Sequence, residues 1–142
     1  MASYRQSQLT ALNGRLSMTL ADDPSIAFIM TRDRAASEAF YRDTLGLRAL
    51  PEDPFAAVFN LAGIKLRITE APDHTPSPHP VLGWQVGDIA SVAQALANKG
   101  VVFIIYEGMD QDALGIWTAP AGRTRVAFFP DPDGNVLSLT QA

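Results

Sequence analysis

Hydrophobic and polar positions divide the first half of the chain into segments with strand-like and helix-like periods. Residues 26–33 form a mixed apolar run that predicts a strand. Residues 35–46 predict a helix, because Asp33 is a suitable N-cap just before them and a glycine closes them. Residues 56–62 and 64–70 predict two further strands, which a glycine separates. The order in this half is therefore strand, helix, strand, strand.

The second half of the chain repeats this order. Residues 81–88 predict a strand, and their terminal aspartate is a suitable N-cap for a helix at 89–100 with one apolar stripe. Residues 101–107 predict a strand, and a long loop follows at 108–122. Residues 128–141 predict a hairpin around the turn Asp-Pro-Asp-Gly-Asn. The repeat predicts a duplicated α+β fold, with a coincidental alternation of strands and helices as the alternative.

Two segments fall outside the repeat. Residues 1–24 predict a short amphipathic arm that packs on the core or on a partner, although Gly14 weakens its helical pattern. The arm carries its leucines at helical spacing: Leu9, Leu12, Leu16 and Leu20. Residues 73–80 are rich in proline and predict a linker. The prediction is an arm (1–24) and one domain (25–142), made of module one (25–72), the linker (73–80) and module two (81–142).

Composition narrows the class of protein. The 142 residues are 47% hydrophobic and 18% charged, which is enough to form one domain with a real core. The net charge of -4 gives no sign of a basic surface for nucleic acid or of a polybasic membrane patch. The chain has no cysteine, which excludes disulfides, thiolate catalysis and cysteine-bound zinc. With no signal-peptide pattern and no transmembrane-length apolar run, we expect a cytoplasmic protein.

Three motifs together resemble the vicinal oxygen chelate superfamily, which includes glyoxalase I, extradiol dioxygenases and bleomycin-resistance proteins. They are AFYRDTLGL (39–47), VGDIASVAQALANKGVVF (86–103) and FFPDPDGNVLSL (128–139). The resemblance spans residues 25–141 and implies an α+β fold. Two βαβββ modules would form a curled mixed sheet around a cleft, often in a dimer. The motifs are specific for this fold and not for an activity.

The resemblance also implies four positions for the ligands of a divalent metal. Here they hold Ile26, Arg67, Val81 and Ser138. Isoleucine and valine have no lone pair, arginine is positively charged, and a lone serine is a poor ligand. We therefore expect no metal and no other cofactor. His79 has the strand parity of Val81 and is a candidate if the register differs; otherwise it is an exposed linker histidine, as is His74.

Strand parity assigns side chains to the expected cleft. Ala27, Ile29 and Thr31 face the helix in the first strand, and Trp84 faces it in the fifth. Seven residues are the candidates for ligand binding: Phe28, Met30, Arg67, Gln85, Tyr106, Trp117 and Ser138. Phe28 and Met30 have a second interpretation, in which they fill a collapsed core.

Several of the polar and aromatic candidates also have a structural interpretation. Arg67 binds an anionic or carbonyl group, or else pairs with Glu70, Glu107 or an aspartate at the rim. Tyr106 and Trp117 form a lid over the cleft, or Trp117 anchors the long loop. The helical run Tyr41-Arg42-Asp43 reads as a solvated face.

The function predicted from these residues is the binding of a small apolar or aromatic molecule, by a homodimer without the metal site of its family. One alternative is an enzyme of the superfamily. It would be a metal-dependent lyase or dioxygenase if the register differs, or a metal-free isomerase that uses Arg67, Gln85 and Ser138. Another alternative is a structural or regulatory dimer with a filled cleft. The sequence carries no Cys/His pair, phosphate loop, H-E-x-x-H motif or nucleophile elbow.

Overall fold

The computed structural model describes residues 19–142, and the first half of the described chain folds into one four-stranded sheet. The sheet has the order β1-β4-β3-β2, with β1 and β4 parallel and the other pairs antiparallel. Its elements are β1 (Ile26–Thr31), α2 (Arg34–Ala39), η1 (Phe40–Thr44), β2 (Arg48–Asp53), β3 (Ala56–Leu61) and β4 (Ile64–Glu70). We call this sheet one. The leucine arm predicted before it lies, apart from Leu20, outside the described residues.

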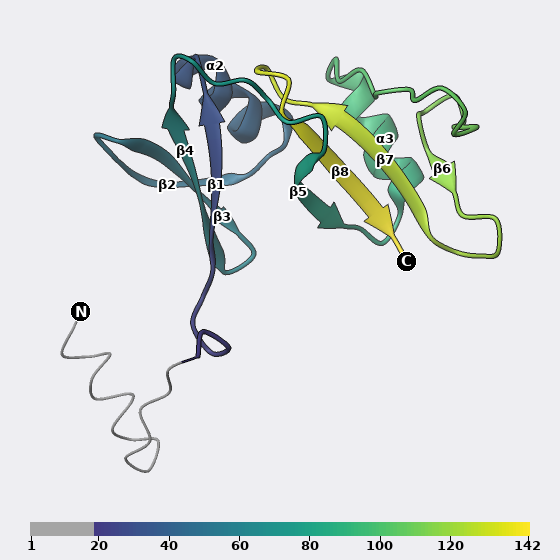
Figure 1. Cartoon of the computed structure of the whole chain (residues 1–142), viewed down its shortest axis with the longest axis horizontal. Helices are drawn as coiled ribbons and strands as arrows, with labels where there is room; N and C mark the ends of the chain where they lie inside the picture. The colour runs from purple at the N-terminus through teal and green to yellow at the C-terminus, as the bar shows by residue number, and fades with distance from the viewer. Residues whose placement is uncertain (1–18) are drawn as a thin grey trace, which may run out of the picture.

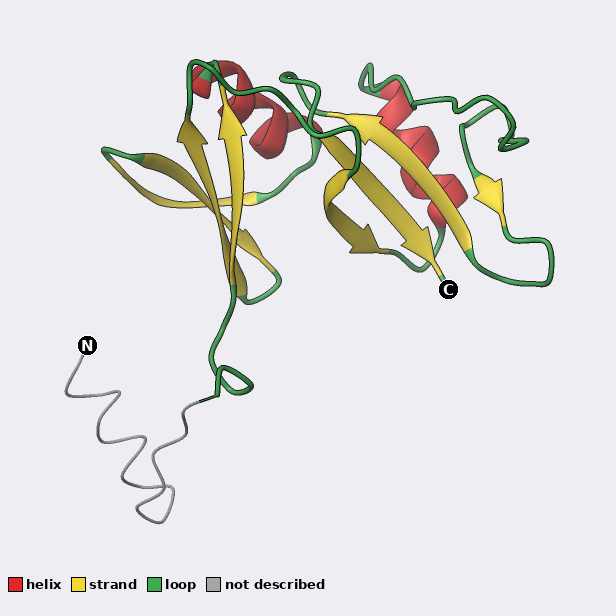
Figure 2. Cartoon of the chain, in the orientation of Figure 1, coloured by secondary structure: helices red, strands yellow, loops and turns green. Residues whose placement is uncertain are grey.

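The second half repeats this topology as sheet two, with the order β5-β8-β7-β6 and with β5 and β8 parallel. Its elements are β5 (Pro80–Gln85), α3 (Ile89–Asn98), β6 (Trp117–Thr118), β7 (Arg125–Pro130) and β8 (Val136–Gln141). Figure 1 shows the two sheets side by side, and Figure 2 shows that each carries its helical segment on one face. The predicted duplicated α+β fold is confirmed.

Aspartate N-caps begin both helical segments, as the sequence predicts. The Asp33 carboxylate accepts a hydrogen bond of 3.1 Å from the backbone N–H of Ala36, and Asp88 accepts one of 3.1 Å from that of Ser91. The first segment is not one α-helix, because its second half is the π-helical η1. Within residues 19–142, no helix is long and apolar enough to cross a membrane.

The hydrophobic core lies on the helical faces of both sheets and forms one cluster. Ile29, Leu66 and Ile68 belong to it from sheet one, and Phe129 and Leu137 from sheet two. Thr31 is also buried, so the predicted helix-facing side of β1 is confirmed. Trp84 packs on the same cluster and stacks on Phe129.

Two predictions about local structure are wrong. Residues 101–107 form no strand, and one ladder-like bond, from Ile104 N–H to Phe128 O (2.8 Å), ties them to β7. The Gln111 side chain takes the place of a ladder, because its amide hydrogen-bonds the backbone of Ile104 and Tyr106. Strand β2 was not predicted either, because it is an edge strand whose proline and register irregularity hide its alternation.

Tyr41 is the third correction. It is fully buried, whereas the sequence placed it on a solvated face. Its hydroxyl donates a 2.7 Å hydrogen bond to the Asp131 carboxylate in module two. Burial, followed by the charge of Asp131, raises the pKa of this hydroxyl far above its usual range. Arg42 and Asp43, the next two residues, are exposed as predicted.

Candidate binding site

The face of sheet one opposite its helix is apolar along β1. We call it open face one. Ile26, Phe28 and Met30 project from it and remain 51%, 58% and 37% exposed. Their neighbours in sequence point into the core, so the alternation is that of a strand with one buried side. The predicted cleft positions Phe28 and Met30 therefore lie on an uncovered face and do not fill the core of the chain.

Arg67 lies at the centre of open face one, between Phe28 on β1 and Val58 on β3. Its guanidinium donates a 2.8 Å hydrogen bond to the carboxylate of Asp53, at the far end of β2. The hydrogen bond from Arg67, together with backbone N–H donors at the following turn, lowers the pKa of Asp53. The sequence left two interpretations of Arg67, a ligand contact or an ion pair, and the structure contains the ion pair with an aspartate. The Arg67 side chain keeps about a quarter of its surface exposed.

The face of sheet two opposite α3, which we call open face two, combines aromatic rings with a flat centre. Phe128, Ser138 and Gly83 form one row across β7, β8 and β5. Gly83 has no side chain, and the Ser138 hydroxyl lies over it: a Cβ at Gly83 would be 2.3 Å from Ser138 Oγ. The Tyr106 ring meets the Phe128 ring edge-on at 5.4 Å. This row leaves a shallow surface on which a planar group has room to pack.

The predicted site residues Trp117 and Gln85 have other neighbours. Trp117 forms β6 and pairs with Val126, so it belongs to sheet two. Gln85 pairs with Thr140 on open face two, and the residue also borders a cavity of about 240 Å³ on the helical side. The cavity lies between the modules, and it could not be predicted from the sequence because its lining comes from both halves of the chain. Its residues are Leu45, Leu47, Trp84, Gln85, Val86, Val92, Leu96 and Leu139.

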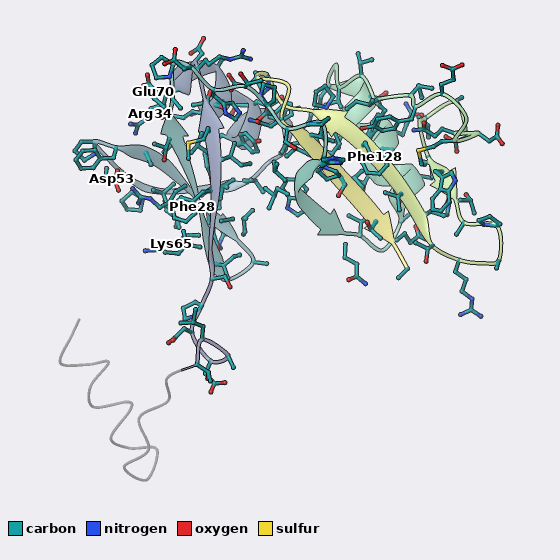
Figure 3. The ribbon with its side chains drawn as sticks, viewed as in Figure 1. Phe28, Arg34, Asp53, Lys65, Glu70 and Phe128 are labelled. Carbon is teal, nitrogen blue, oxygen red and sulfur yellow. The ribbon has the colours of Figure 1, made fainter. Side chains whose placement is uncertain are left out.

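The two open faces do not cover one another within one chain. Besides the three β1 residues, Val81 on β5 is 47% exposed. The modules share a core on their helical sides instead. In Figure 3, Lys65 and Asp53 lie on the side of sheet one turned away from sheet two, which carries Phe128. Each chain therefore presents two separate walls.

The turn after β7 fixes the angle between the two modules. Asp133 accepts hydrogen bonds from the Thr31 hydroxyl and from the Arg32 backbone N–H (2.8 Å) at the end of β1. Asn135 donates one of 3.0 Å to the backbone carbonyl of Met30. The Nε2 atom of His74 also lies 2.6 Å from Asn135 Oδ1, and His74 is half-buried, so it is not an exposed linker histidine. We call the turn 131–135, with its hydrogen bonds to module one, the clamp. The clamp fixes the C-terminal end of β1, the strand that carries the apolar column of open face one.

A divalent metal does not fit the four positions that the resemblance implies. Ile26 and Val81 offer no donor atom, and the Arg67 guanidinium already donates to Asp53. Ser138 leaves one neutral hydroxyl, which is a poor ligand alone. His79 lies just before β5 and is exposed. In the described part of the chain, no three His, Cys, Asp or Glu side chains are grouped to hold a metal ion.

Comparisons with known proteins agree with the fold. The model of the Glyoxalase/Bleomycin resistance protein/Dioxygenase superfamily matches residues 23–139, and the chain belongs to this superfamily. Curated protein sequences give no significant match.

Solved structures of the same fold include three that cover most of the chain. A glyoxalase family protein from Bacillus anthracis has 15% identity and a TM-score of 0.67, over 88% of this chain and 98% of its own. TnmS3, an antibiotic-binding protein from Streptomyces sp. CB03234, has 22% identity and a TM-score of 0.66, over 87% and 98%. Lactoylglutathione lyase from Agrobacterium tumefaciens has 16% identity and a TM-score of 0.63, over 85% and 94%. At these identities the likeness concerns the fold.

Proposed function

We propose that this protein binds a small apolar or aromatic molecule in a cup formed by two copies of the chain. Open face one of one copy would form one wall, and open face two of the second copy the other. The observation that carries the proposal is the exposure of Ile26, Phe28 and Met30 around Arg67. Such an apolar strand face with one polar group is typical of a ligand site or an interface.

The homodimer supplies what a single chain lacks. Because the β1 column of open face one and Val81 of open face two are exposed, a twofold partner would bury apolar surface on both faces at once. The site would be incomplete in a monomer. A binding role also agrees with the printed description of TnmS3, a relative in fold that binds an antibiotic.

The proposed function needs no metal. The cytoplasmic location of the protein remains a prediction from the sequence. The isomerase alternative loses support, because Arg67 is paired with Asp53. The residues paired with Ser138 on the neighbouring strands, Gly83 and Phe128, offer no base.

The experiment is a calorimetric titration of the purified protein with small aromatic compounds, beside elemental analysis after dialysis. We expect about one bound molecule per chain and no stoichiometric metal. Phe28→Ala and Phe128→Ala should each weaken binding about tenfold or more, since each removes a buried contact from one wall. Val102→Ala, at an apolar residue outside both open faces, is the matched control. Stoichiometric metal, or affinity unchanged in both wall variants, would refute the proposal.

A further inference from the structure

Positive charge gathers on open face one. Arg48 on β2 and Lys65 on β4 both neighbour Asn60 of β3 in one row across the sheet, and Arg67 lies in the next row. Asp53 is the acidic residue paired into this face. The whole chain carries a net charge of -4, so this face has the opposite sign to the protein as a whole. A site of this kind attracts anions.

Two of the three cations are available. Arg67 is held by Asp53, as described above. Arg48 and Lys65 are exposed, and neither forms an ion pair or a side-chain hydrogen bond with another described residue. Lys65 is also the strand neighbour of Ile26, so a free ammonium stands beside the apolar column of β1. Neighbouring strands lie about 5 Å apart, which places charge and apolar surface within the span of one small molecule.

The opposite wall favours a planar group. Gly83 projects no side chain and the small Ser138 hydroxyl fills the place of one, while the Phe128 and Tyr106 rings pack edge-on beside this row. Aromatic groups pack well on such rings in offset or edge-on geometry. A long flexible alkyl ligand would make fewer contacts with this flat part of open face two than a planar ring.

From these features we infer that the ligand is a small planar aromatic anion. Its ring would lie between Phe28 of one copy and Phe128 of the other. Its carboxylate or sulfonate would meet Lys65 and Arg48. The inference rests on the proposed function and adds the charge and shape of the ligand to it.

The test compares three probes on the full chain by calorimetry: 1-naphthoate, its neutral analogue 1-naphthalenemethanol, and hexanoate, an anion without a ring. Naphthoate should bind about tenfold to a hundredfold more tightly than the alcohol, the effect of a charge-assisted contact. Hexanoate should bind more weakly than both. High salt should reduce the preference for naphthoate, because exposed charges are screened.

Variants then locate the charge. The double variant Arg48→Gln/Lys65→Gln should lose the preference for naphthoate and keep its affinity for the alcohol. Lys99→Gln, at a cation on the helical side that bonds the backbone of Asp43 and Thr44, should keep the preference. Equal binding of naphthoate and alcohol, or a preference that survives the double variant, overturns the inference while the aromatic cup stands. Absence of binding by all three probes overturns the inference and the proposed function together.

Discussion

The hydroxyl of Tyr41 donates a 2.7 Å hydrogen bond to the carboxylate of Asp131, ninety residues later in the chain. The bond joins the η1 segment of module one to the turn between β7 and β8 of module two. Asp131 also accepts hydrogen bonds from the backbone N–H groups of Asp133 and Asn135, both at 2.9 Å. One carboxylate thus shapes the turn and ties it to the other module.

Tyr41→Phe should destabilise the protein by about 1–3 kcal/mol, because Asp131 loses a donor in a buried place while the ring packing remains. Chemical denaturation measures the change in the free energy of unfolding. Tyr106→Phe is the control, since the Tyr106 hydroxyl has no hydrogen-bond partner among the described residues. Equal stability of Tyr41→Phe and the wild type would contradict a stabilising role of the hydrogen bond between Tyr41 and Asp131.

Asp133 makes the stability of this clamp depend on pH. Burial raises the pKa of Asp133, but hydrogen bonds from Thr31 and Arg32 outweigh burial and leave the pKa below its ordinary value. A lowered folded pKa means that the unfolded chain takes up the proton first as pH falls. The stability contributed by Asp133 is therefore complete above its ordinary pKa of about 4 and is lost as pH falls through the folded pKa.

Asp133→Asn should accordingly lower stability at neutral pH by about 1–3 kcal/mol and flatten the further loss between about pH 5 and pH 2. Denaturation curves across this range measure both effects. Asp73→Asn, at an exposed aspartate of the linker, should follow the wild-type curve. The account fails here if Asp133→Asn retains the full acid dependence of the wild type.

Gly83 and Ser138 should be coupled energetically. In Gly83→Ala the new Cβ would meet Ser138 Oγ at 2.3 Å, so the serine must move, and we expect a cost of about 1–3 kcal/mol. Ser138→Ala should relieve part of this cost, which a double-mutant cycle measures. Gly87→Ala, where no atom lies within 4 Å of the new Cβ, is the control. An identical cost of Gly83→Ala with and without the serine would exclude the contact.

The dimer should depend on open face one. Sedimentation of the wild type at micromolar concentration should give twice the chain mass of 15.3 kDa. Phe28→Glu should weaken association at least about tenfold, since it places a charge where apolar surface is buried. Val102→Glu changes an apolar residue that is even more exposed (78% against 58% for Phe28) but lies outside both open faces, and should leave the dimer intact. A monomeric wild type would remove the second wall from the proposed cup.

Signals that act over a few residues predicted much of this fold. The caps at Asp33 and Asp88 depend on backbone groups three residues away, and the period of β4 assigns Arg67 to the face opposite the core. Such features are encoded locally, so the sequence reveals them. The repeat of one order in both halves then indicated the duplicated architecture.

Contacts between distant segments could not be predicted in this way. The partner of Arg67 is Asp53 because a register irregularity in β2 brings that carboxylate onto open face one. Tyr41 looked solvated because its partner Asp131 comes from the other module. Residues 101–107 have the composition of a strand, but the Gln111 side chain satisfies part of their backbone. Each case depends on tertiary context that overrides the local pattern.

A mixed dimer tests most directly whether two copies build one cup. Phe28→Ala/Lys65→Gln damages open face one, and Phe128→Ala damages open face two. Each variant alone should lose naphthoate binding at both sites of its dimer. Co-expressed with different affinity tags and isolated as the mixed dimer, they should regain one intact site per dimer, about half the wild-type stoichiometry, because twofold symmetry pairs the undamaged faces. A mixed dimer that binds no more naphthoate than either variant alone would contradict the account.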